Sequence, residues 1–213
     1  MGVSRNIKAH VDSYGRVMYY TYKKGRHCSP IEVAGMLDGP VLVEFEGEPH
    51  VLDQRANLVG KNVVLPRVRT MGWGILIKAG VEFKNPDSDV ETTLLSGSAI
   101  INRDRSEQPS IGVGLKLGER AVLAATLVRN AVVIGRETTI GDVPVIGSNT
   151  EFGNMVKIIR SGPIGDSVKI KDRAEIDTSG PIADYLQVAE GATIATHGEE
   201  PPRSDRPNLR IVE

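Results

Sequence analysis

Large apolar residues recur at every sixth position through the second half of the chain. The series starts at Val122, one step after Lys116, and all thirteen of its positions hold Val, Ile or Phe. An α-helix needs apolar spacings of three and four, whereas a spacing of six fits the two-residue period of a strand interrupted by a turn in each unit. The pattern therefore predicts short strands joined by turns. The thirteen residues are Val122, Val128, Ile134, Ile140, Ile146, Phe152, Ile158, Ile164, Ile170, Ile176, Ile182, Val188 and Ile194.

The six-residue units (hexads) are themselves grouped in a longer repeat of eighteen residues. The sequence Ser161-Gly162-Pro163-Ile164 returns as Ser179-Gly180-Pro181-Ile182. Three hexads then make one triangular coil, and residues eighteen apart stack on strands roughly 4.8 Å apart. Opposite charges at this spacing are expected to pair between coils. The three expected pairs are Glu151 with Lys169, Lys157 with Glu175, and Asp142 with Arg160.

The remaining hexad positions complete a recognisable pattern. The residue after each large apolar one is often Gly or Ala, as at Gly135, Gly147 and Ala183, and the residue two before it is mostly small or β-branched. This pattern resembles the hexapeptide-repeat superfamily over roughly residues 120–197. The resemblance implies a left-handed parallel β-helix. A right-handed solenoid of the bactofilin type is the competing geometry, although its repeats keep less strictly to six.

Some residues depart from the repeat. Ile159, Lys171 and Asp177 stand where Gly or Ala is usual, and we expect local bulging there. The resemblance leaves function open, because the superfamily includes acyltransferases, carbonic anhydrases and non-catalytic scaffolds.

The chain divides into three predicted regions. Residues 1–118 form a β-rich N-terminal region, either a cap or an irregular extension of the solenoid. Residues 119–197 form the hexapeptide-repeat β-helix, and residues 198–213, rich in proline and charge, form an extended tail. The predicted fold class is thus all-β: a left-handed parallel β-helix with a β-rich N-terminal region.

Two local signals stand out in the N-terminal region. Ser29-Pro30-Ile31-Glu32 has the form of a capping box with proline at the first helical position, and predicts a short helix to about Leu37. Residues 40–46 and 50–53 are predicted to form a hairpin around Gly47.

Composition argues against several classes of protein for this chain. The 26 Lys and Arg balance 27 Asp and Glu, which argues against a surface built wholly for nucleic acid. No apolar run approaches the ~20 residues that span a bilayer, and no apolar signal core follows Met1, so we expect a cytoplasmic protein without membrane contact. The single cysteine, Cys28, excludes an internal disulfide.

The histidines limit the catalytic interpretations. His10, His27, His50 and His197 all lie outside the continuous repeat from 134 to 194. The acyltransferases that the pattern resembles use a histidine as general base, so His197 would be the base if this chain were one. The carbonic anhydrases of the superfamily need three clustered histidines, and no metal site is expected. The aspartates near the coil turns are interpreted as hydrogen-bonding their own backbone.

Basic and aromatic residues are concentrated near the N-terminus. One interpretation is a binding site for an acidic protein or polyanion, because cations between aromatic rings suit phosphate and nucleic-acid partners. The alternative is an ordinary strand whose tyrosines pack on a neighbour while its lysines stay hydrated. The candidate binding residues are Lys23, Lys24, Arg26, Tyr20 and Tyr22.

Three functions remain in view, and nucleic-acid or polyanion binding at the basic N-terminus is the least favoured of them. The first is a non-catalytic scaffold or assembly protein without a cofactor, forming homo-oligomers, with a trimer favoured. Outward apolar residues such as Met155, Ile159 and Val143 would form its contact face. The alternative is a hexapeptide-repeat acyltransferase with acetyl-CoA as donor and an active site between subunits.

Overall fold

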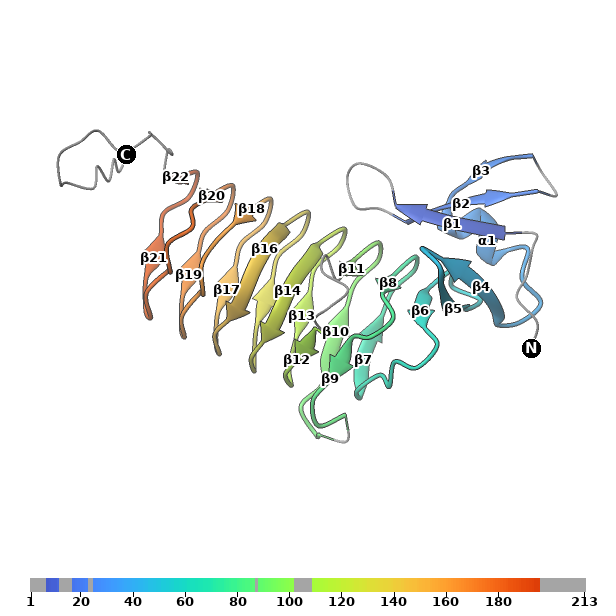
Figure 1. The fold of residues 1–213 in the computed structure, drawn as a ribbon, viewed down its shortest axis with the longest axis horizontal. Helices are drawn as coiled ribbons and strands as arrows, with labels where there is room; N and C mark the ends of the chain where they lie inside the picture. The colour runs from blue at the N-terminus through green and yellow to red at the C-terminus, as the bar shows by residue number, and fades with distance from the viewer. Residues whose placement is uncertain (1–6, 12–16, 23–24, 87, 102–108, 196–213) are drawn as a thin grey trace.

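The computed structural model describes residues 7–11, 17–22, 25–86, 88–101 and 109–195. Short parallel strands stack into successive coils along one axis, and an antiparallel unit covers the N-terminal end (Figure 1). One short helix is present among these residues. The expected fold class, an all-β parallel β-helix with a β-rich N-terminal region, is confirmed.

The coils have three faces, each a ladder of parallel strands. Face 1 and face 3 each form a continuous ladder along the solenoid, while face 2 is built from shorter pairings and ends in bridges joining Ile146, Ile164 and Ile182. Face 1 holds β6 (Leu58–Gly60), β8 (Leu76–Ile77), β11 (Ala99–Ile100), the first half of β14 (Val122–Val128), the first half of β16 (Thr139–Ile146), β18 (Lys157–Arg160), β20 (Glu175–Asp177) and β22 (Thr193–Ala195). Face 2 holds β9 (Glu82–Phe83), β12 (Ser110–Ile111) and the second halves of β14 and β16. Face 3 holds β7 (Val68–Met71), β10 (Thr92–Leu94), β13 (Lys116–Leu117), β15 (Val133–Ile134), β17 (Glu151–Phe152), β19 (Lys169–Ile170) and β21 (Gln187–Val188).

The six-residue series forms the solenoid core, with a correction at each end. From Val128 to Val188 every member is buried in one apolar cluster, while Ile194 in the last described coil is half-buried. At the other end Leu123, not Val122, pairs with Ile140. This coil is one residue shorter than eighteen, so the inward position moves by one.

The hexad therefore continues before residue 122 in a shifted register. Leu117 pairs with Ile134, and Ile111 pairs with Val128, again at a spacing of seventeen residues. Lys116 ends the sequence pattern only because its neighbour Leu117 is the inward residue, buried in the same core. Parallel pairing reaches back to β6 and β7.

Six elements precede the coils. They are β1 (Ile7–Val11), β2 (Val17–Thr21), β3 (Arg26–Cys28), α1 (Pro30–Ala34), β4 (Val41–Phe45) and β5 (Glu48–Leu52). The capping box is confirmed: the Ser29 hydroxyl accepts the Glu32 N–H, and the Glu32 carboxylate accepts the Ser29 N–H at 2.9 Å. The helix ends at Ala34, earlier than the expected Leu37.

The predicted hairpin is also confirmed, and it closes one end of face 1. β4 and β5 pair antiparallel through a tight turn in which Glu46 and Gly47 have φ of 50° and 83°. β5 then pairs antiparallel with β6, so the hairpin extends the ladder of the coils. The hairpin thus covers the edge of the first coil on face 1, and β4 becomes the terminal strand of the ladder.

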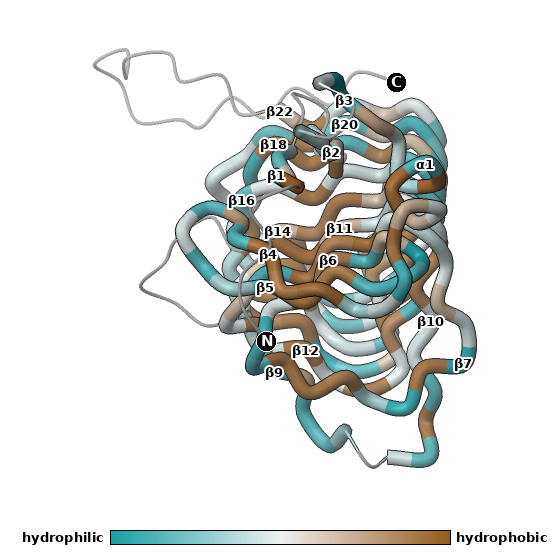
Figure 2. The backbone as a smooth tube through the Cα atoms, turned by 90° about the vertical axis from the view of Figure 1, so that its right-hand side faces the viewer, coloured by the Kyte–Doolittle hydropathy of each residue, from teal (hydrophilic) through white to brown (hydrophobic). Residues whose placement is uncertain are grey.

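The N-terminal sheet of β1, β2 and β3 packs on the outside of face 1. The outward residues of the first coils there are apolar, and they share a second buried cluster with the inner side of the sheet and with α1. Tyr19 lies at its centre, and its hydroxyl donates to the Ala56 carbonyl at 2.6 Å. Figure 2, seen from this end, shows these elements in front of the coils. The outward residues are Leu58, Leu76, Ala99 and Val122, and the next ones along the face are Thr139, Lys157 and Glu175.

Two of the three expected charge pairs form between coils. Lys157 binds Glu175 at 3.0 Å, and Lys169 lies 3.9 Å from Glu151. The third pair is confirmed in strand register but not as an ion pair. Arg160 lies in register with Asp142 but its guanidinium binds Asp177 at 2.6 Å.

The changed partner of Arg160 follows from a shift in strand register. β18 and β20 slip by one residue between Ile158 and Arg160, which brings Asp177 opposite Arg160. The bulging expected at Ile159 and Asp177 is therefore present. Each of these exposed pairs contributes at most about 1 kcal/mol.

Turn aspartates bond between coils, not within their own turn. Asp166 Oδ1 accepts the Ser148 N–H at 2.6 Å, and Asp184 Oδ1 accepts the Asp166 N–H at 2.8 Å. Asp172 Oδ1 accepts the Asn154 N–H in the same way, and this backbone bond lowers the pKa of Asp172. The expectation of bonds to their own backbone was wrong, because each of these carboxylates accepts an N–H eighteen residues earlier, in the preceding coil.

Candidate functional site

A cleft beside His50 and the outer side of the N-terminal sheet each bring chemical groups together. Neither is a metal centre, since no group of three or more His, Cys, Asp or Glu in the described ranges could hold an ion. No helix in this part of the chain is long and apolar enough to cross a bilayer.

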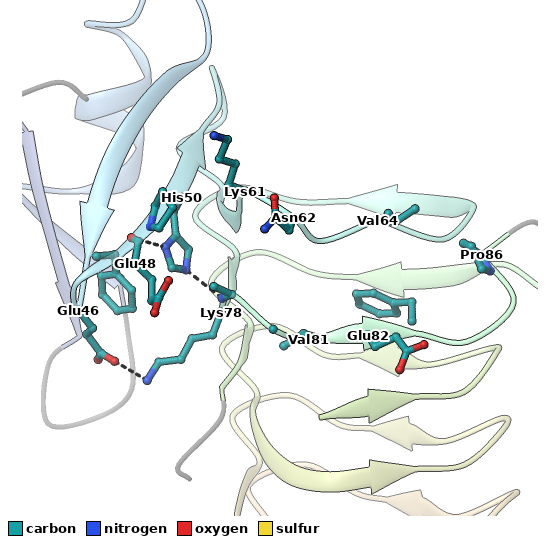
Figure 3. Close-up of a pocket in the computed structure, with 15 residues that line it drawn as sticks. Glu46, Glu48, His50, Lys61, Asn62, Val64, Lys78, Val81, Glu82 and Pro86 are labelled. Carbon is teal, nitrogen blue, oxygen red and sulfur yellow. Dashed lines mark hydrogen bonds and ion pairs between the residues drawn. The ribbon is translucent and has the colours of Figure 1, made fainter. Parts of the chain in front are cut away.

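The cleft lies where the β4–β5 hairpin meets the first coils (Figure 3). Its volume is about 670 Å³. Acidic, basic and apolar side chains line it together. The lining residues are Phe45, Glu46, Glu48, Pro49, His50, Lys61, Asn62, Val64, Lys78, Ala79, Gly80, Val81, Glu82, Phe83 and Pro86.

His50 is held at both ring nitrogens. Nε2 accepts the Ala79 N–H at 3.2 Å, so the ring proton sits on Nδ1, which donates to the Glu48 carbonyl at 3.0 Å. The residue is buried, and burial lowers its pKa. A general base needs an accepting nitrogen directed at substrate, and here that nitrogen is used by the backbone. His50 therefore joins the hairpin to the first coil.

Two of the charged side chains in the cleft are paired with each other. Lys78 Nζ binds Glu46 at 2.5 Å and lies 6.0 Å from the centre of the Phe45 ring. Figure 3 shows this pair spanning from the hairpin to the coils. Glu82 is paired with Lys84 at 2.7 Å. These contacts make the cleft a structural junction between the hairpin and the solenoid.

The junction should weaken in mild acid. The pKa of His50 is lowered in the folded protein, so below about pH 6.5, its unfolded value, the unfolded chain binds more protons. Stability is therefore complete above about pH 6.5 and falls as the pH drops towards the folded pKa. We expect the melting temperature to decrease between about pH 7.5 and about pH 5.5.

The matched variants are His50→Gln and His27→Gln, followed by circular dichroism across the same pH range. His50→Gln should flatten the dependence, whereas His27→Gln, at an exposed site, should not. An unchanged pH profile in His50→Gln would contradict the assignment.

The second place is the outer side of the N-terminal sheet. Five residues there form what we call the aromatic face: Lys8 and His10 on β1, Tyr20 on β2, Tyr22 just after it, and His27 on β3. Adjacent ring centres are 4.9 Å apart for His10 and His27, 5.4 Å for His27 and Tyr20, and 5.3 Å for Tyr20 and Tyr22. Lys8 Nζ lies 5.8 Å from the centre of the Tyr22 ring. Strand pairing thus gathers four rings and one ammonium on one side.

The predicted binding residues divide between this face and elsewhere. Tyr20 and Tyr22 come together on it. Arg26 does not join them, because its guanidinium binds Glu32 of the capping box at 2.6 Å. Lys23, Lys24 and the predicted base His197 lie outside the described residues.

Sequence reasoning missed Lys8, His10 and His27 as members of the face. The signal was the alternation of side chains along paired strands, which puts Lys8 beside Tyr20 and Tyr20 beside His27. The same alternation turns Cys28 to the inner side, where it is buried. His27 and Cys28 therefore point to opposite sides of β3 and share no site.

Comparisons with known proteins give little beyond these observations. No protein-family model matches the chain, and no curated protein matches it. Two solved structures are similar in part. One is the acetyltransferase domain of PglB from Neisseria gonorrhoeae, with 15% identity and a TM-score of 0.30 over 68% of this chain and 57% of that one. The other is a mutant of GDP-perosamine N-acetyltransferase from Caulobacter crescentus, with 16% identity and a TM-score of 0.29 over 65% of this chain and 52% of that one. The chain thus spans little more than half the length of either structure.

Proposed function

We propose that this chain is a β-solenoid assembly protein that associates with copies of itself along face 2. The observation that carries the proposal is the outward column of this face, which begins with Glu82 but is uncharged from Ser110 onward. Leu127 and Val145 are half-buried, and Pro163 and Pro181 are exposed. We call these four residues the apolar strip.

The strip differs from the outward columns of the other two faces. Face 1 presents Lys157 and Glu175 beyond the N-terminal sheet, and face 3 presents Glu151 and Lys169. Prolines are tolerated on face 2 because its ladder uses the N–H groups of the neighbouring isoleucines: Ile164 donates to Val145 at 2.8 Å. A flat column without charge is the kind of surface that another copy of the same column can cover.

The contact residues differ from those expected from the sequence. Val143 is only 2% exposed and belongs to the core, because β16 runs straight through that corner. Met155 and Ile159 are exposed, but they lie on two different corners, one on each side of the strand at Lys157–Ile158. The apolar strip replaces them in the proposal. A trimer remains the expected size, from the resemblance of the repeat.

Light scattering after size exclusion tests this assembly. Val145→Lys should shift the protein towards monomer, because a charge would enter the centre of the strip and would be desolvated in the contact. Val133→Lys is the matched control, since Val133 is also half-buried and outward, but on face 3 between Lys116 and Glu151. Equal masses for both variants and the unchanged protein would contradict a contact through face 2. A monomeric unchanged protein at micromolar concentration would contradict assembly itself.

Acyl transfer is the second candidate function, and it is supported by the residue repeat, which resembles that of known acyltransferases. In this proposal acetyl-CoA binds between subunits and His197 acts as the base. The same oligomer would then be needed for both functions. Thermal shift with acetyl-CoA, followed by turnover assays on the intact chain and on His197→Ala, separates the two. Binding and turnover lost in His197→Ala would favour acyl transfer.

A further inference from the structure

The aromatic face is not needed to hold the N-terminal sheet together. The inner side of the sheet already buries Val17, Tyr19 and Cys28 against the coils and α1. On the outer side, Tyr22 is 51% exposed, and Lys8 and His27 are exposed as well. Aromatic side chains at such positions are more costly to leave in water than polar ones, which points to a role in contact with another molecule.

Neighbouring rings of the face meet edge to face, with interplanar angles of 74° for His10 and His27, 72° for His27 and Tyr20, and 83° for Tyr20 and Tyr22. Lys8, Tyr20 and His27 stand directly across from one another on three paired strands. The rings of Tyr20 and His27 contact each other, and each contacts one further ring, Tyr22 and His10 respectively. Flat ligands can stack on the exposed rings of this face. Nucleic acids offer flat bases together with a negatively charged phosphate backbone.

Charge favours the same class of ligand. The first 27 residues contain six Lys and Arg against the single acid Asp12, although the whole chain has a net charge of -1. Within the face, Lys8 places its ammonium 5.8 Å from the centre of the Tyr22 ring. Glu44 of β4 is the acid that acts on Lys8 from outside the sheet.

We propose that the aromatic face binds single-stranded nucleic acid, with bases stacked on the exposed rings of Tyr22 and His27 and a phosphate at Lys8. Binding of this kind tolerates many sequences, because every base offers a π-face. Duplexes bind more weakly, since their bases are already stacked on each other. The proposal is independent of the assembly through face 2. The aromatic face is the outer side of the N-terminal sheet, and the inner side of that sheet packs on face 1.

The test is fluorescence anisotropy of the full chain with a labelled oligothymidylate of about 15 nucleotides, a length within the range that such surfaces cover. Tyr22→Ala should weaken binding about tenfold through the loss of one stacked base. Tyr185→Ala is the matched control, because Tyr185 is 76% exposed in a coil near the other end of the solenoid. Lys8→Ala should lower the slope of log affinity against log salt by about 0.7.

A second variant and two further ligands keep the test decisive. His27→Ala should also weaken binding, and it serves if circular dichroism shows that Tyr22→Ala fails to fold. Tyr22→Phe should retain binding, since the ring remains. Heparin, a polyanion without bases, and a duplex of the same length should both bind more weakly than the single strand.

Equal affinity for heparin and the oligonucleotide, together with no loss in Tyr22→Ala and His27→Ala, would overturn the proposal in favour of an acidic partner bound by charge alone. No binding of the oligonucleotide at low salt would overturn it as well. Val145→Lys should bind the oligonucleotide like the unchanged chain, so failure of the assembly proposal is distinguishable from failure of this one.

Discussion

Ile164→Asp is expected to unfold the β-helix. Ile164 is 1% exposed and is bridged to Ile146 and Ile182 in the coils on either side. A carboxylate in this narrow apolar core has no cation or hydrogen-bond donor to pair with among the core residues. The cost of burying such a charge is several kcal/mol, comparable with the total stability of a domain at about 5–15 kcal/mol. Circular dichroism should show loss of the β signal at room temperature.

The control is Gln187→Asp, at an exposed outward position on face 3 whose neighbour in the ladder is Lys169. It introduces the same carboxylate and should melt within a few degrees of the unchanged protein, because surface substitutions rarely change stability by more than about 0.5 kcal/mol. A folded Ile164→Asp variant with a similar melting temperature would show that the core assigned to the six-residue series is wrong.

Gly147→Ala is expected to produce the second largest loss of stability. A Cβ on Gly147 would fall against the Gly165 carbonyl in the next coil and 2.6 Å from the Asp166 amide nitrogen. These are backbone atoms, so the coils themselves would have to separate. Overpacking of this kind costs about 3 kcal/mol, which corresponds to a fall in melting temperature of about 6–12 °C for a protein of this size.

Gly39→Ala is the control for the same chemical change. A Cβ there meets no atom within 4 Å, and the backbone of Gly39 is not in the left-handed region. This variant should match the unchanged protein or gain up to about 1 kcal/mol by restricting the unfolded chain. Equal melting temperatures for the two variants would mean that the glycine column does not set the spacing of the coils.

The sequence alone was enough to predict the elements whose signals are local. A spacing of six identified the inward residues from Val128 to Val188, and a spacing of eighteen identified Lys157 and Glu175 as partners. The capping box at Ser29 and the hairpin around Gly47 were also readable. In each case the decisive residues lie close together in the chain or repeat at a fixed interval, so a pattern of side-chain types suffices.

The register predictions that failed did so where the strand register shifts by one residue, which counting in steps of six or eighteen does not detect. One coil has seventeen residues, which exchanges the roles of Val122 and Leu123. A bulge in a later coil gives Arg160 a new partner, Asp177. Both follow from how a strand pairs with its neighbour, and a shift of one residue reverses which side chains face inward.

The candidate site depended most on tertiary structure. Tyr20 and Tyr22 were predicted, but His10 and His27 meet only because β1 and β3 flank the same strand. Arg26 was predicted as a ligand-binding cation, but it lies beside α1 and forms an ion pair with Glu32 instead. Composition and spacing thus determined the β-helix and its core, while long-range packing decided which polar side chains meet, because those contacts join segments whose separation in sequence follows no period.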